Sequence, residues 1–188
     1  MSSKAFRDAV ALMVDKEFVA HDVLGGSAYP VYVSIPEGNA RWFSAAAARE
    51  IAAPYVGRAT DERLRGAVEL LAAAGFSWEA APHIDVTGAV VAGSPIRFEG
   101  ELVRPLELLA PGPTYDPLRE TYAVWIETWL EQLGFSVEIE ATDFNNLISS
   151  IYLANEAGEL DFDLYLLGWS LGDPSLPTHY EDFWSRTP

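Results

Sequence analysis

The sequence predicts an α/β domain in which helices flank a mixed, mainly parallel sheet. Over residues 101–168, strand-like and helix-like segments alternate, and glycine or proline separates most segments from the next. The helix-like segments carry apolar residues three and four positions apart, which is the spacing of one buried helical face. A strand–helix–strand–helix–strand order requires parallel pairing with right-handed crossovers, because parallel neighbours cannot be joined by a tight turn.

The first part of the chain predicts one amphipathic helix followed by an extended region. Residues 6–18 place apolar side chains on one helical face, namely Phe6, Ala9, Val10, Met13 and Val14. Gly25 and Gly26 end regular structure. Residues 27–58 are rich in proline and alanine, and Pro30 and Pro36 exclude a long central strand. We expect an extended loop region over 27–58 that includes an irregular helical stretch.

The next segment predicts a capped helix and then a small hairpin. Thr60 suits an N-cap, and Asp61 and Glu62 fall in the first turn, where the helix dipole favours anions. Gly75 suits the left-handed residue that ends a helix. Residues 76–100 contain short β-prone pieces separated by glycine, which predict a small hairpin within a single domain over 1–188.

From residue 101 the pattern becomes regular. Residues 102–109 predict a strand, and Asp116 followed by Pro117 predicts the start of a helix, because proline at the first helical position loses no hydrogen bond. The apolar face of that helix comprises Tyr122, Trp125, Ile126, Trp129, Leu130 and Leu133, and Gly134 ends it. Residues 135–141 alternate as a strand. Thr142 or Asp143 then starts a helix with Phe144, Leu147, Ile148 and Ile151 facing inward.

The last predicted strand leads into the candidate binding residues. The apolar run 162–167 suits a strand that is buried on both faces. Ligands of open α/β sheets sit at the carboxyl ends of strands. We therefore take the residues after this strand as candidate ligand-binding residues, namely Trp169, Ser170, Gly172 and Asp173. In the alternative interpretation, Trp169 caps the core and Asp173 starts a turn.

Composition excludes several classes of function. The chain has 188 residues, and its formal net charge of −16 argues against binding to nucleic acid or an anionic membrane. The absence of cysteine removes disulfides and thiolate chemistry. No apolar run is long enough to cross a bilayer. A surface this acidic and poor in lysine suggests adaptation to high salt, where screening relieves the repulsion between carboxylates.

No residue pattern requires catalysis, a metal or a cofactor. His21, His83 and His179 are isolated, without the spacing of metal ligands. Asp161 and Asp163, together with Glu159, leave open a carboxylate-dependent hydrolase. They are better explained as solvated charges at the start of a strand, where they keep an exposed sheet edge from pairing with another strand. A protein-interaction domain of another α/β family is the remaining alternative.

Five segments resemble family 5 of the extracellular solute-binding proteins, which serve ABC importers of the oligopeptide, dipeptide and nickel type. They follow the order of that family along nearly the whole chain. The segments are Phe6–Glu17, Val23–Ala28 with the prolines after it, Ala67–Phe76, Trp129–Glu138, and Phe162 to Pro174 with its Gly-Trp and Asp-Pro pairs.

The resemblance implies one lobe of the periplasmic-binding-protein type II kind. Its members close two lobes on a solute, and this chain corresponds to most of the second lobe, with the first lobe and a leader expected outside it. The implied partners are a peptide-like or other small organic solute, the other lobe, and ABC permease subunits, at the extracellular or periplasmic face of the membrane. No cofactor and no enzymatic activity are implied.

One position departs from the family. Peptide-binding members have an aspartate three residues after the Gly-Trp tryptophan, where it pairs with the α-amino group of the ligand. Here that position is Gly172, and Asp173 follows it. The resemblance therefore leaves open whether Asp173 takes this role or the solute has no such amine.

Overall fold

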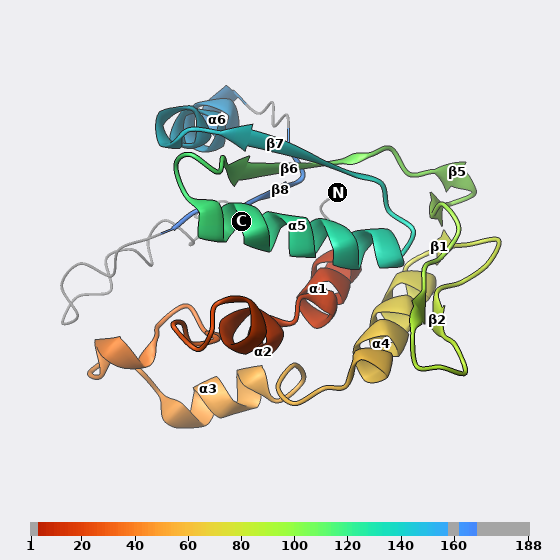
Figure 1. Cartoon of the computed structure of the whole chain (residues 1–188), viewed down its shortest axis with the longest axis horizontal. Helices are drawn as coiled ribbons and strands as arrows, with labels where there is room; N and C mark the ends of the chain where they lie inside the picture. Colours follow the sequence, from red (N-terminus) through yellow and green to blue (C-terminus); the bar gives the residue numbers. More distant parts are fainter. Residues whose placement is uncertain (1–3, 158–161, 169–188) are drawn as a thin grey trace. The chain divides into compact units, whose positions relative to one another are not determined.

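A computed structural model describes residues 4–157 and 162–168 (Figure 1). The chain divides into two compact units, of which the first comprises Met1–Asp15 and Arg58–Leu167 and the second comprises Lys16–Gly57 and Gly168–Pro188. The first unit contains the parallel sheet and the helices that pack on it. None of the helices in residues 4–157 combines the length and apolarity that a membrane crossing needs. A single domain over 1–188 stays a prediction.

The parallel sheet of the first unit confirms the predicted alternation. Strands β6 (Leu106–Pro111), β7 (Val137–Thr142) and β8 (Leu164–Tyr165) pair in the order β7–β6–β8, and both pairings are parallel. Helix α5 (Pro117–Gln132) connects β6 to β7, and helix α6 (Phe144–Ala157) follows β7. The arrowheads of β6 and β7 therefore point to one edge of the sheet, where α6 begins (Figure 1).

The strand that is buried on both faces is β6, in which only Glu107 is half-buried, and the prediction of burial on both faces for the 162–167 run is wrong. Leu106, Leu108 and Leu109 are at most 2% exposed, whereas Tyr165 of β8 is 41% exposed. Strand β6 lies between its two neighbours, and within the described residues β8 pairs with β6 alone. An apolar run fits a central strand and an edge strand equally well, because the position of a strand in the sheet is set by tertiary pairing.

Two helices of the first unit pack against each other beneath the aromatic core. Helix α1 (Lys4–Met13) contacts α4 (Thr60–Ala73), and Phe6, Ala9, Ala67 and Leu71 are buried between them. The ring of Phe6 meets that of Phe135 edge to face at 5.4 Å. The predicted helix over 6–18 is interrupted after Met13, and α2 (Lys16–Phe18) and the π-helix η1 (Val19–Val23) follow in the second unit.

The predicted helix ends are confirmed at most positions. Asp116 caps α5 by accepting the N–H of Arg119 at 3.0 Å, and Gly75 and Gly134 adopt φ of +94° and +90° just after α4 and α5. At the start of α4 the N-cap is Ala59 rather than Thr60. The carboxylate of Glu62 accepts the N–H of Ala59 at 3.3 Å, so a side chain of the first turn satisfies this backbone group.

Short antiparallel strands form two small sheets between α4 and β6 in the sequence. Strands β1 (Phe76–Ser77), β4 (Arg97–Phe98) and β5 (Glu101–Leu102) form one small sheet, and β2 (His83–Ile84) pairs with β3 (Val90–Val91) as a hairpin. The single strand predicted over 102–109 is thus two strands, β5 and β6. Their separation includes Pro105, which has no N–H to donate to a ladder.

The second unit is formed by short elements around an extended segment. It contains the 3-10 helix η2 (Glu37–Asn39) and helix α3 (Ala45–Ala52), besides α2 and η1. Ser44 caps α3 by accepting the N–H of Ala47 at 3.4 Å. Lys16 donates to the carbonyl of Val31 at 2.8 Å, and its ammonium lies 4.9 Å from the centre of the Tyr32 ring.

Candidate functional site

All the ligand-binding residues predicted from the sequence lie outside the described part of the chain. These are Trp169, Ser170, Gly172 and Asp173. Gly168, the last described residue, follows the carboxyl end of β8. The carboxyl ends of β6 and β7 lie at the same edge of the sheet, and the structure describes both.

The segments that leave β6 and β7 are hydrogen-bonded to each other. The N–H of Gly112, just after β6, donates to the carbonyl of Thr142 at the end of β7 over 2.9 Å. Gly112 then accepts the N–H groups of Tyr115 and Asp116 at 2.9 and 3.0 Å, which forms a tight turn before α5. The two carboxyl ends thus form one continuous surface, which we call the carboxyl edge.

Two aromatic side chains lie together on the carboxyl edge. The rings of Tyr115 and Phe144 have centroids 6.0 Å apart with 39° between their planes. Tyr115 is 50% exposed and Phe144 is 42% exposed, so neither ring is part of the core. The prediction that Phe144 faces inward is wrong, whereas Leu147, one turn later, is buried as predicted. Paired exposed rings at strand ends present an apolar surface to a ligand.

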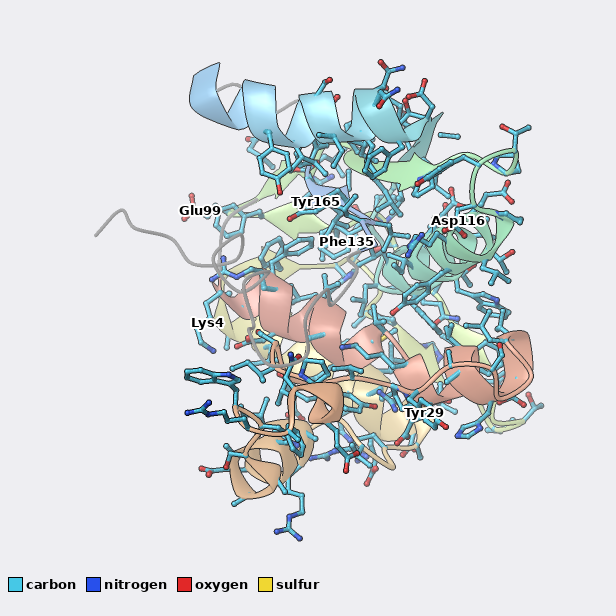
Figure 2. The ribbon with its side chains drawn as sticks, turned by 90° about the vertical axis from the view of Figure 1, so that its left-hand side faces the viewer. Lys4, Tyr29, Glu99, Asp116, Phe135 and Tyr165 are labelled. Atoms are coloured by element: carbon cyan, nitrogen blue, oxygen red, sulfur yellow. The ribbon has the colours of Figure 1, made fainter. Side chains whose placement is uncertain are left out.

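Carboxylates occupy the amino ends of both helices at this edge. Asp116 accepts the N–H of Arg119 and forms an ion pair with its guanidinium (Figure 2 labels Asp116 at the start of α5). Asp143 accepts the N–H groups of Asn145 and Asn146 at 2.9 and 3.0 Å, and the side-chain amide of Asn146 at 2.9 Å. In other proteins the backbone N–H groups at helix starts bind anions. Here the N–H groups of Arg119, Asn145 and Asn146 are bonded instead to the protein's own carboxylates.

Asp163 lies at the opposite end of β8 and has a structural role. Its side chain is 2% exposed and accepts from Arg104 and from the N–H of Glu107. Burial by itself raises the pKa of Asp163, but the interactions that favour its charged form, of which the hydrogen bond from the Glu107 N–H is the largest, hold that pKa below its usual range. The prediction that Asp163 is a solvated charge at the start of the strand is wrong. Asp161 and Glu159 lie outside the described residues.

Other chemistry is not supported in the part of the chain that the structure describes. An ionised, ion-paired Asp163 with a lowered pKa is unsuited to donate a proton, as a paired-carboxylate hydrolase would require. Across residues 4–157 and 162–168, His, Asp and Glu side chains form no group of three that would hold a metal ion.

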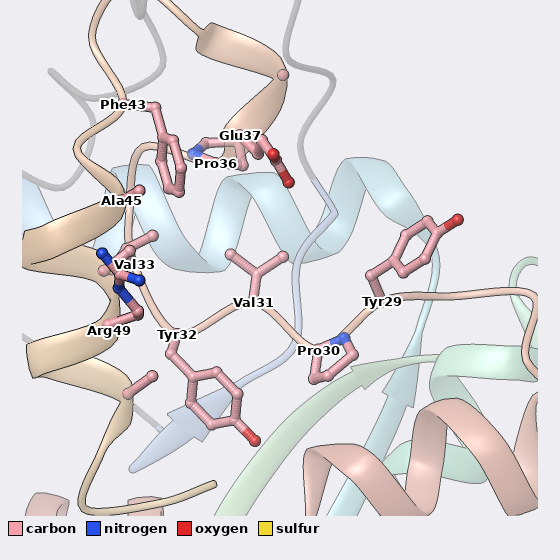
Figure 3. Close-up of a pocket in the computed structure, with 13 residues that line it drawn as sticks. Tyr29, Pro30, Val31, Tyr32, Val33, Pro36, Glu37, Phe43, Ala45 and Arg49 are labelled. Carbon is pink, nitrogen blue, oxygen red and sulfur yellow. The ribbon is translucent and has the colours of Figure 1, made fainter.

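The second unit carries an open groove of about 630 Å³ (Figure 3). The extended segment 29–36 lines it with Tyr29, Tyr32 and Val33, and helix α3 contributes Arg49. Tyr29 is 90% exposed. No feature of the described residues identifies what would occupy this groove, so it carries no assignment.

Sequence reasoning missed the pair of Tyr115 and Phe144, although one signal pointed to them. Each residue follows a predicted strand by a few positions, and strands of a parallel sheet end at one edge. Of the two tryptophans predicted on the apolar face of α5, Trp129 is buried, whereas Trp125 is only half-buried.

One family model matches the whole chain. The model of "Bacterial extracellular solute-binding proteins, family 5 Middle" matches residues 1–188. No curated protein matches the chain.

Several solved structures share the fold at 18–21% identity. The periplasmic murein tripeptide-binding protein MppA, in its unliganded open form, gives a TM-score of 0.65 over 99% of this chain and 29% of its own. The oligopeptide-binding protein AppA from Bacillus subtilis, in complex with a nonapeptide, gives 0.58 over 94% of this chain and 29% of its own. NikZ from Campylobacter jejuni, in complex with Ni(L-His), gives 0.56 over 89% and 27%. The chain thus spans less than a third of these proteins, and the predicted fold class is confirmed.

Proposed function

Because the chain belongs to family 5 of the bacterial extracellular solute-binding proteins, we propose that it forms one side of a solute-binding site at its carboxyl edge. The family consists of solute-binding proteins and not of enzymes. The proposed site comprises the exposed rings of Tyr115 and Phe144.

The observation that carries this proposal is the pair of Tyr115 and Phe144. Large aromatic side chains bury well over 100 Å² each when they are covered. Two of them lie exposed side by side, on segments held by the bond between Gly112 and Thr142, so a ligand that covers both rings would bury apolar surface on a fixed backbone. The ends of parallel strands are also where α/β sheets bind ligands.

The residues predicted from the sequence remain proposed ligand-binding residues. We propose Trp169 as an aromatic contact for the solute, Asp173 as its charge or hydrogen-bond partner, and Ser170 and Gly172 as further contacts. The proposed solute is a peptide-like or other small organic molecule. Gly172 stands where peptide-binding members have the aspartate that pairs with an α-amino group, so either Asp173 takes that role or the solute has no such amine. AppA with its nonapeptide and NikZ with Ni(L-His) illustrate this range within the fold.

A single lobe encloses only part of a solute. Small-molecule sites bury most of the ligand surface, and affinity depends on that enclosure. We propose that a second lobe closes over the carboxyl edge by a hinge motion and that the closed protein delivers its solute to an ABC permease. This places the protein at the extracellular or periplasmic face of the membrane.

The experiment uses saturation-transfer NMR, which detects weak binding, on the full 188-residue chain. The panel comprises dipeptides to pentapeptides and Ni(L-His), at millimolar concentration. We expect at least one solute to receive saturation, and Tyr115→Ala and Phe144→Ala each to abolish it while the thermal midpoint stays within a few degrees. Tyr29→Ala removes an exposed aromatic in the second unit and is the matched control. Binding that survives both edge substitutions would refute the proposed site.

A further inference from the structure

We infer that the groove of the second unit binds a segment of the chain itself, namely residues 174–177 with the sequence Pro-Ser-Leu-Pro. The described residues alone give this groove no occupant, and the segment lies outside them. The inference goes beyond the proposed function and is independent of the solute site at the carboxyl edge. It rests on the lining of the groove, on the spacing of the two prolines, and on the length and charge of the chain around them.

The groove is mostly apolar, and contacts within the second unit hold its walls in place. Three aromatic rings lie around it (Figure 3), those of Tyr29, Tyr32 and Phe43. The Tyr32 ring stacks on that of Tyr55 with centroids 6.1 Å apart, and the Lys16 ammonium lies over the Tyr32 ring. The N–H of Phe43 donates to the carbonyl of the buried Asn39 at 3.1 Å. The groove is therefore a preformed surface.

A segment with two prolines three residues apart suits an aromatic groove of this kind. In the polyproline II conformation the chain has three residues per turn and rises 3.1 Å per residue, so two such prolines project from the same edge about 9 Å apart. Aromatic grooves bind segments of this type at low entropic cost, because the conformation is already formed before binding. Pro174 and Pro177 are the only two prolines of the sequence with this spacing.

The connection between the described residues and this segment is short. Gly168 belongs to the same unit as the residues that line the groove, and five residues separate it from Pro174. An extended chain of that length reaches about 20 Å. A short tether keeps the segment at an effective concentration on the order of millimolar, so even a weak contact with the groove is largely occupied.

The charges favour one direction for the bound segment. Arg49 of α3 is exposed and lines the groove, and Figure 3 shows it apart from Glu37, the acidic residue of the lining. Glu181 and Asp182 follow Pro177 by four and five residues. Acidic residues after the two prolines are attracted to the end of the groove that carries Arg49 and are repelled from Glu37.

The first experiment asks whether the segment lies at the groove. The sequence has no cysteine, so Ser175→Cys creates a single attachment site for a nitroxide spin label between the two prolines. The unpaired electron of the label broadens the amide signals of residues close to it. In the full 188-residue chain we expect broadening at Val31, Val33 and Ala48, which line the groove. If these three signals keep their widths, the inference is overturned.

Two sets of variants of the labelled chain separate binding by the motif from mere proximity. Pro174→Ala with Pro177→Ala should abolish the broadening, because alanine does not fix the polyproline II conformation. Ala45 and Ala46 are neighbouring exposed residues of α3, and of the two only Ala45 lines the groove. Ala45→Glu, which places a long charged side chain in the groove, should weaken the broadening, whereas the matched control Ala46→Glu should leave it unchanged. Broadening that survives the double proline variant, or equal effects of the two alanine variants, would contradict the inference.

A peptide of residues 172–180 tests whether the groove is already occupied. It is titrated into the unlabelled chain and into the Pro174→Ala, Pro177→Ala variant, and the amide shifts of Val31 and Val33 report binding. We expect the variant to bind the peptide about tenfold tighter than the wild type, because the segment of the wild type competes for the same groove. Equal affinities would show a groove that is open to a proline-rich segment of another molecule, and the inference would be overturned. It would also be overturned if the variant bound no peptide at millimolar concentration.

Discussion

Asp163 and Glu107 bind each other twice. The backbone N–H of Asp163 donates to the carbonyl of Glu107 at 2.9 Å, and the carboxylate of Asp163 accepts the N–H of Glu107 at 3.1 Å. Arg104 adds a charged bond of 2.9 Å to the same carboxylate. These bonds fix the start of β8 on β6, and the register Leu108–Leu164 follows from them. The strand that leads to Trp169 is thus aligned from its amino end.

Asp163→Ala should destabilise the first unit by about 1–3 kcal/mol, because it leaves the Glu107 N–H without its acceptor in a part-buried position. Asp163→Asn keeps a side-chain oxygen for that N–H and should cost less. Urea unfolding followed by circular dichroism measures both. Glu101→Ala, at an exposed position of β5, is the control and should stay within about 0.5 kcal/mol of the wild type. A loss no larger for Asp163→Ala than for this control would contradict the assigned role.

The stabilisation by Asp163 should disappear in acid. The pKa of Asp163 in the folded protein lies below the value of about 3.9 expected for an unfolded chain. For such a group, the contribution to stability is complete above the unfolded pKa and falls as the pH drops through the folded pKa. The difference in unfolding free energy between wild type and Asp163→Asn should therefore be constant from pH 7 to about 5 and shrink below about 4. A difference that grows in acid would contradict the direction of the shift.

Local sequence signals predicted the elements of the first unit, whereas they did not predict which residues of different elements contact each other. The caps by Asp116 and Asp143 and the helix end at Gly134 depend on residues close in the chain, so short patterns reveal them. The pair of Tyr115 and Phe144 forms because Gly112 bonds to Thr142 across two strands. No pattern in one segment encodes that contact.

The error at residues 162–167 has the same origin. Apolar composition predicted a strand, and β8 exists, but only the pairing order places β6 in the centre and β8 beside it. Asp163 was interpreted as a solvated charge because its partners are distant in sequence. Arg104 is 59 residues away and Glu107 is 56 away. The predicted ligand residues Trp169 and Asp173 stay predictions.

Gly134→Ala should be far more damaging than Gly100→Ala, although both glycines have φ of +90°. A Cβ at Gly134 would lie 2.3 Å from the carbonyl oxygen of Ser94, whereas a Cβ at Gly100 would meet nothing within 4 Å. We expect about 1 kcal/mol for Gly100→Ala from backbone strain alone, and about 2–5 kcal/mol for Gly134→Ala from strain and overpacking. Chemical unfolding measures both, and equal losses would show that the Ser94 contact relaxes freely.

Arg63→Ala should cost about 2–4 kcal/mol, because Arg63 is 4% exposed and its guanidinium is bonded to several groups of the first unit. Its guanidinium donates to the carbonyls of Leu12 and Arg58 and pairs with Asp15 at 3.3 Å. The matched control is Arg65→Ala two residues later, where an exposed pair with Asp61 should contribute less than about 0.5 kcal/mol. Thermal and urea unfolding compare the two variants. Similar losses would contradict a specific role for Arg63.

The acidic surface leads to a prediction about salt. Burial raises the pKa of Glu127, and repulsion from the carboxylate of Glu131 raises it further, so these acids already disfavour each other's charge. With a net charge of −16, such repulsion extends over the whole chain. Screening should relieve it, and we expect the thermal midpoint to rise markedly from low to multimolar KCl.

A charge-reduced variant separates screening from the general effect of salt on burial of apolar surface. Glu69→Gln, Glu101→Gln and Glu138→Gln together remove three exposed negative charges without touching the core. If repulsion is the cause, this variant should melt at a higher temperature than the wild type in low salt and gain less from added KCl. Potassium chloride would stabilise both proteins equally if it acted only through water and apolar surface. If the thermal midpoint of the wild type did not change between low and multimolar KCl, adaptation to a saline habitat would be contradicted.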